Sequence, residues 1–209
     1  LHIVLAYLLI CNFASNSLLM TIIESERIIL RDLVDQDIEI FYNYRSDDDL
    51  LKYQDFSVRS LEETQTFIQE QKTISIGQSN QWKQIGIALK DNQLIGDCAI
   101  QFTPEEIRIA EIGCTISREF HSKGYATEAL RLLTKHTFKN YPIHKFKALV
   151  DIRNLPSQKM LLKVGFEKEA HFKKHYWDEK DKDWVDELQY GLLGQKIMDY
   201  ELWIMNYEL

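Results

Sequence analysis

The sequence predicts an α/β (α+β) domain built on a mixed, mostly antiparallel β-sheet flanked by helices. Three observations support this fold class. The expected order of elements is β-α-α-β-β-β-α-β-α-β-β, two pairs of neighbouring strands are joined by polar turns, and the strand at 107–116 leads into a helix through a short loop. The chain has 209 residues, of which 45% are hydrophobic, so it can bury a sizeable core in one domain.

The first half of the chain is expected to contain a strand, two helices and a hairpin. In order, these elements are a strand at 27–31, a helix from Asp35, a helix from Ser60, and strands at 82–89 and 94–102. The side chain of Asp35 can cap a helix, and Ser60 with Glu63 forms a capping-box pattern. The polar residues 90–93 separate the two strands, so they predict a hairpin turn.

The second half is expected to alternate strands with helices and to end in a hairpin. Its predicted elements are a strand at 107–116, a helix at 124–138, a strand at 145–150, a helix from Asn154 to Gly165, and paired strands at 167–177 and 184–192. Pro156 suits the first turn of the helix that follows Asn154, and Gly165 suits its end.

The two ends of the chain differ from the expected domain at 20–193. Residues 1–19 are apolar and carry no charge. We expect them to be upstream sequence before a natural start at Met20, and a membrane-directed leader is the alternative. Residues 194–209 are expected to form a helical C-terminal extension, because apolar residues recur there at helical spacing.

The composition narrows the class of protein. A net charge of −7 argues against a nucleic-acid-binding domain, which is usually basic, and is compatible with cationic substrates such as amines. Three cysteines lie far apart without metal-ligand spacing, which indicates reduced thiols in the cytoplasm. His171 and His175 would lie about 13 Å apart on a strand, too far for one metal ion. We therefore expect a cytoplasmic protein with no metal site and no membrane or nucleic-acid partner.

The most informative segment is the strand, loop and helix at 111–130. Its loop places Lys123 and Gly124 at the first turn of the helix. Free backbone N–H groups and the positive end of the helix dipole meet there, which suits a phosphate. The preceding strand offers backbone groups to an extended ligand. The segment therefore predicts a site for a long molecule that carries a phosphate.

Four motifs, at 111–116, 124–129, 154–166 and 185–190, occur in an order that resembles the GNAT superfamily of acyl-CoA-dependent N-acetyltransferases. Within the superfamily, residues 20–193 look most like the branch of ribosomal-protein N-terminal (alanine) acetyltransferases. His121 and Ser122 depart from the family's phosphate-loop pattern. The backbone cradle can survive both changes, because N–H groups do most of the binding, whereas side-chain contacts from His121 do not follow from the resemblance.

The resemblance implies that acetyl-CoA is the cosubstrate. Its pantetheine arm is expected to extend along the strand at 111–116, and its pyrophosphate to bind the loop. The implied binding residues are Cys114, Thr115, Ile116, His121, Ser122, Lys123, Gly124, Tyr125, Ala126, Thr127, Asn154, Ser157 and Leu161. For Asn154 two interpretations stay open, a helix cap and a contact with the pantetheine arm.

The implied reaction needs a neutral amine, because the nitrogen attacks the thioester directly. An α-amine, with a pKa of about 7.7–8.0, needs less help than a lysine at about 10.4. Glu111 is the candidate base, acting through water, and the alternative is a strand carboxylate paired with a cation. Ser157 is the candidate acid, and the alternative is an ordinary first-turn residue. Related enzymes often use a tyrosine where this chain has Leu161.

We therefore expect an acetyl-CoA-dependent N-acetyltransferase that works in a ternary complex and acetylates a protein N-terminal α-amine. A small amine, such as a polyamine or aminoglycoside, is the alternative acceptor. A catalytically silent acyl-CoA-binding module is the alternative from another class. Residues 47–49 are expected to form a solvated loop or an entry for a cationic substrate. Both a monomer and a homodimer fit the sequence.

Overall fold

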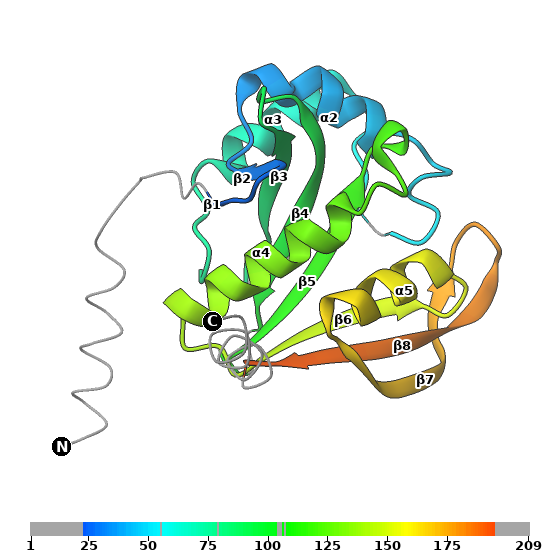
Figure 1. Ribbon diagram of the computed structural model, residues 1–209. Helices are drawn as coiled ribbons and strands as arrows, with labels where there is room; N and C mark the ends of the chain where they lie inside the picture. Colours follow the sequence, from blue (N-terminus) through cyan, green and yellow to red (C-terminus); the bar gives the residue numbers. More distant parts are fainter. Residues whose placement is uncertain (1–22, 55, 79, 104–105, 107, 195–209) are drawn as a thin grey trace.

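The computed structural model describes residues 23–194, except positions 55, 79, 104, 105 and 107. These residues form the predicted α/β fold, an eight-stranded sheet with helices packed against it (Figure 1). The strands lie in the order β1-β2-β3-β4-β5-β6-β8-β7. Neighbouring strands are antiparallel except β5 and β6, which are parallel.

The bounds of the elements follow the chain order. They are β1 (Ile23–Glu24), β2 (Ile28–Arg31), η1 (Asp35–Asp37), α2 (Ile38–Arg45), α3 (Leu61–Gln71), β3 (Lys83–Leu89), β4 (Leu94–Phe102), β5 (Ile109–Ile116), η2 (Arg118–Phe120), α4 (Tyr125–Asn140), β6 (Lys145–Asp151), α5 (Leu155–Val164), β7 (Glu167–Asp178) and β8 (Asp183–Leu193).

The predicted order of strands and helices is confirmed, and β1 is an additional short strand. Ser60 caps α3, since its Oγ accepts a hydrogen bond from the Glu63 N–H at 3.1 Å. The Glu63 carboxylate accepts from the N–H of Arg59, one residue before the cap, at 2.7 Å. The predictions for residues 1–19, Met20 and the C-terminal extension lie outside the described residues.

The prediction that Asp35 caps the first helix is wrong. Asp35 begins the 3-10 turn η1 and binds Lys72 at 2.5 Å. The turn places Asp37 where it can pair with Arg31, which is almost fully buried. A buried guanidinium is costly without a carboxylate, so this pairing overrides the local capping preference.

Helices cover the two faces of the sheet in pairs. Successive residues of a strand point to opposite faces, and this alternation separates Asp97 from Cys98 on β4. Asp97 bonds to Tyr44 and Arg45 of α2. Cys98 belongs to the large apolar core that includes Leu130 of α4. Hence α2 and α3, which share a second core cluster, cover one face, and α4 and α5 cover the other.

The parallel strands β5 and β6 diverge along their length (Figure 1). Their paired residues are Ile109 with Lys145, Ala110 with Phe146 and Glu111 with Lys147. From 112 to 116, β5 has β4 as its paired neighbour, and its other edge is open. A Cβ added to Gly113 would meet no atom within 4 Å. The two strands therefore separate after Glu111 and Lys147, and this separation is the opening beside the second half of β5.

The two histidines of β7 bind separate carboxylates. His171 lies 2.6 Å from Asp186, and His175 lies 2.5 Å from Glu187. Among the described residues, no group of His, Cys, Asp and Glu side chains is arranged to hold a metal ion. None of the helices described has the length and apolar character needed to cross a membrane.

Candidate active site

The loop between β5 and α4 turns through two residues with positive φ. Ser122 has φ 60° and Gly124 has φ 84°, and Gly124 is the N-cap of α4 without a side-chain capping bond. No acceptor in the described part of the chain meets the N–H groups of Tyr125, Ala126 and Thr127. These N–H groups lie at the positive end of a 16-residue helix. The arrangement is suited to an anionic ligand, as the sequence predicts for the loop.

His121 anchors this loop to the end of β5. Its Nε2 donates a hydrogen bond to the carbonyl of Ile116 at 2.7 Å. The imidazole thereby closes the turn that carries Ser122 and Gly124. The residue that departs from the family's pattern therefore holds the loop in place, while the backbone N–H groups stay available.

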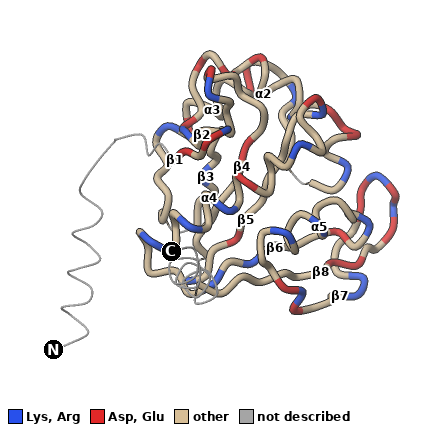
Figure 2. The backbone as a smooth tube through the Cα atoms, viewed as in Figure 1, with Lys and Arg blue, Asp and Glu red and all other residues tan. Residues whose placement is uncertain are grey.

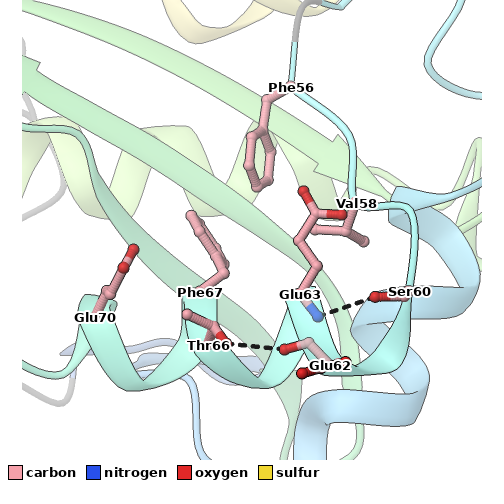
Figure 3. Close-up of a pocket in the computed structure, with 8 residues that line it drawn as sticks. All are labelled: Phe56, Val58, Ser60, Glu62, Glu63, Thr66, Phe67 and Glu70. Carbon is pink, nitrogen blue, oxygen red and sulfur yellow. Dashed lines mark hydrogen bonds between the residues drawn. The ribbon is translucent and has the colours of Figure 1, made fainter.

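A pocket of about 440 Å³ lies elsewhere, between α3 and the segment before it (Figure 3). Its walls combine the rings of Phe56 and Phe67 with three glutamates of α3. None of the predicted site residues lines it. A second pocket, of about 530 Å³, borders the start of α4 and is lined by Arg27, Gly124, Thr127, Glu128, Arg131, Leu132 and Lys163. The second pocket adjoins the predicted phosphate loop.

Two arginines of the second pocket were not predicted from the sequence. Arg27 is held by Glu128, with Nε 2.8 Å from Oε2, and its Nη1 donates to the Lys123 carbonyl at 3.2 Å. The hydrogen bond with Glu128 raises the pKa of Arg27. Arg131 follows Thr127 by four residues and so lies on the same face of α4. This spacing could have indicated from the sequence that Arg131 lies near the loop. Nothing local in the sequence indicates this for Arg27, because its partner Glu128 is 101 residues away.

The three predicted residues of β5 alternate between the faces of the sheet. Cys114 is half-buried and lies opposite Cys98 on β4, and both thiols are free. The hydrogen bond with Cys114, together with burial, raises the pKa of the Cys98 thiol. Thr115 is buried on the opposite face, and its Oγ1 donates to Oε1 of Gln54 at 2.6 Å. Ile116 is part of the apolar core.

The predicted residues of α5 begin where β6 ends, across the opening from β5. Asn154 is the N-cap, since its Oδ1 accepts from the N–H of Ser157 at 3.1 Å. The capping interpretation is therefore confirmed, and the contact with a pantetheine arm stays a prediction. Ser157 is half-buried, whereas Leu161 is 2% exposed and packs in the core. The predicted contact of Leu161 with the cofactor stays a prediction.

Glu111 lies at the closed end of the opening. Its Oε2 is 3.0 Å from Nζ of Lys147 on β6, and both side chains are largely buried. The structure thus contains the ion-paired strand carboxylate that was the alternative to a general base. Thr115 is four residues further along the strand, which corresponds to about 13 Å. The role of Glu111 as a base acting through water stays a prediction.

Two surface segments meet beyond the end of β6. The Lys180 Nζ donates to the Asp48 carbonyl at 3.0 Å, and the Arg153 guanidinium lies over the ring of Tyr53 at 5.5 Å. Figure 2 shows charges of both signs along the 178–183 turn. Asp47 pairs with Arg118 at 2.5 Å, so the acidic loop 47–49 is partly neutralised by the protein itself.

Comparison with known proteins identifies a shared domain. Residues 27–167 match the family model described as an acetyltransferase (GNAT) domain. The chain is 25% identical over 174 residues to the uncharacterized N-acetyltransferase YnaD of Bacillus subtilis (strain 168). That alignment covers 83% of this chain and 98% of YnaD.

Two solved structures share the fold. RimL, a ribosomal L7/L12 α-N-protein acetyltransferase in complex with coenzyme A, gives a TM-score of 0.72 at 21% identity, covering 83% of this chain and 98% of RimL. The spermidine N-acetyltransferase of Vibrio cholerae, in complex with CoA and spermine, gives a TM-score of 0.70 at 19% identity. The alignment covers 83% of this chain and 99% of the Vibrio protein. Their names specify different acceptors, a protein α-amine and a polyamine.

Proposed function

The chain belongs to the GNAT family of acetyl-CoA-dependent N-acetyltransferases, and from this premise we propose that its acceptor is the N-terminal α-amine of a protein or peptide. The amine attacks the thioester carbonyl directly, in a ternary complex with acetyl-CoA. The open edge of β5 supports the binding of an extended pantetheine arm, because its backbone groups are unpaired by β6. The free N–H groups at the start of α4 support the binding of the pyrophosphate.

The choice of acceptor is supported by the ion pairs that the two nearby carboxylates form within the protein. Glu111 and Asp97 point to the same face of the sheet as Thr115, because of their positions in the strand register. Glu111 pairs with Lys147, and Asp97 pairs with Arg45. A base that is ion-paired and acts only through water suits an amine with a pKa near neutrality. An α-amine meets this condition, and a lysine or polyamine does not.

Direct attack is supported by the surroundings of Cys114. Its neighbour across the strands is Cys98, and no imidazole in the described residues is hydrogen-bonded to either thiol. A cysteine that forms an acyl intermediate needs a base that activates it. The half-buried Ser157, at the opposite side of the opening, is the proposed donor of a proton to the departing thiolate.

The test is release of free coenzyme A from acetyl-CoA in the presence of a panel of amines. The panel contains peptides with different first residues, the same peptides with blocked N-termini, spermidine and an aminoglycoside. We expect release with free N-terminal peptides and none with blocked ones. Release with spermidine or the aminoglycoside alone would contradict the proposed acceptor. Binding of acetyl-CoA without release for any amine would favour a catalytically silent module.

A further inference from the structure

Gln54 connects the loop after α2 to the middle of the predicted reaction site. Its Oε1 accepts two hydrogen bonds, from Thr115 Oγ1 at 2.6 Å and from Arg45 Nη1 at 2.9 Å. A guanidinium only donates, so the atom that faces Arg45 must be the oxygen of the amide. The orientation of the Gln54 side chain is therefore defined by its partners.

The partner Arg45 is itself immobilised. It is 3% exposed, and its Nε donates to Oδ1 of the fully buried Asp97 at 3.0 Å. Asp97 also accepts from Tyr44 at 2.8 Å and from Gln84. These hydrogen bonds between buried groups restrict the position of the Arg45 side chain. It holds Gln54 against Thr115 from the side of α2.

The other half of the Gln54 amide has no partner among the described residues. Its Nε2 carries two donor hydrogens, and the residue is exposed. Thr115 points to the same face as Gly113, two residues earlier, where an added Cβ would meet no atom within 4 Å. An oriented, unused donor thus lies on the α2 side of the opening, next to the segment predicted to hold the thioester.

We infer that Gln54 determines acceptor specificity by donating a hydrogen bond from Nε2 to the first backbone carbonyl of a peptide acceptor. The inference rests on the proposed function. A thioester held along the edge of β5 would use the backbone N–H groups in the plane of the sheet, whereas Gln54 contacts Thr115 on the face of the sheet that α2 covers. The first carbonyl is adjacent to the attacking α-amine, and a polyamine has no such oxygen.

The matched variants are Gln54→Glu and Gln54→Ala. Gln54→Glu keeps an oxygen that can accept from Thr115 and Arg45, and it replaces the Nε2 donor by an acceptor. It therefore separates the proposed hydrogen bond to the peptide from the contacts that hold the loop. Each variant is assayed with a peptide and with an amine that carries the same first side chain but lacks the carbonyl. The readout is the ratio of kcat/KM for the peptide to kcat/KM for this amine. A general effect of the new charge on cationic acceptors cancels in the ratio.

We expect both variants to lower this ratio about tenfold or more, through KM for the peptide, with unchanged affinity for acetyl-CoA. Rescue of the ratio by Gln54→Glu would show that Gln54 only anchors the loop and would overturn the inference. An equal loss of kcat for both acceptors would also overturn it, because Gln54 would then act on the thioester. Failure of the unmodified protein to bind acetyl-CoA would instead contradict the proposed function, and calorimetry distinguishes this case.

Discussion

Glu111 and Lys147 occupy the last paired positions of β5 and β6, and their side chains form an ion pair with a distance of 3.0 Å between Oε2 and Nζ. The pair marks the point where the two strands separate. It also holds the candidate base at the closed end of the opening, about four residues from Thr115. At this distance we expect any role of Glu111 in catalysis to be indirect, through water, which is consistent with the proposed α-amine acceptor.

The first prediction concerns Glu111→Gln. We expect kcat/KM to fall up to about tenfold below pH 8, where an α-amine is largely protonated, and to approach the unmodified value above it. Lys147→Gln is the control, because it breaks the ion pair but retains the carboxylate. The measurement is a pH–rate profile of all three proteins. A profile that Glu111→Gln leaves unchanged would remove Glu111 from the mechanism.

The second prediction tests the phosphate loop. Gly124→Glu places a negative side chain beside the free N–H groups of α4, so we expect the affinity for coenzyme A to fall at least about a hundredfold. Gly165→Ala is the control. It introduces a side chain at another positive φ, 113°, at the end of α5, and should cost stability without changing affinity. Titration calorimetry gives both dissociation constants, and retained affinity in Gly124→Glu would contradict the loop assignment.

The third prediction concerns the buried pair of Asp97 and Arg45. Removal of one partner leaves an uncompensated charge in the core, so we expect Asp97→Ala to lower the free energy of unfolding by about 3–5 kcal/mol. Asp35→Asn breaks the exposed pair with Lys72 and should cost much less, because solvent screens this pair. Urea unfolding of the three proteins provides the comparison. Similar midpoints for both variants would show that Asp97 is not a structural anchor.

The fourth prediction is that the stability provided by Arg153 depends on pH. The hydrogen bond from Arg153 lowers the pKa of Asp178 from 3.8 to about 2. The Asp178 carboxylate therefore binds a proton less readily in the folded state than in the unfolded state. The stabilisation from its pairing with Arg153 is complete above about pH 4 and is lost as the pH falls through 2. We expect Arg153→Met to be less stable than the unmodified protein at pH 7, with a difference that shrinks between pH 4 and pH 2.

Arg59→Met is the control for this experiment, because the exposed pair of Arg59 with Asp48 has a distance of 3.2 Å and both partners face solvent. Thermal unfolding midpoints from pH 2 to pH 7 provide the measurement. A difference between Arg153→Met and the unmodified protein that stays constant over this range would contradict the proposed linkage.

Local signals made much of the fold predictable. Ser60 and Gly165 mark a helix start and a helix end, because their effects depend on neighbours within a few residues. Asp35 does not cap the helix, because the turn is arranged so that Asp37 pairs with the buried Arg31. A local sequence pattern does not reveal such a tertiary contact. Likewise, no local pattern indicates that β8 lies between β6 and β7.

The same distinction applies to the site. The loop at Gly124 follows from one continuous segment, and its backbone geometry agrees with the sequence pattern. Gln54 and Thr115 are 61 residues apart, and Arg45 and Asp97 are 52 apart. Their contacts depend on the position of α2 across the sheet. Side chains that act across such separations could not be assigned from one sequence.

The choice between an α-amine and a lysine as acceptor is tested with a peptide that carries a free N-terminal α-amine and an internal lysine. After incubation with acetyl-CoA and the protein, fragmentation mass spectrometry locates the acetyl group. We expect one acetyl group, on the N-terminal nitrogen, because the neutral fraction near pH 7.5 is far larger for the α-amine than for the lysine. Acetylation of the lysine with an unmodified N-terminus would contradict it.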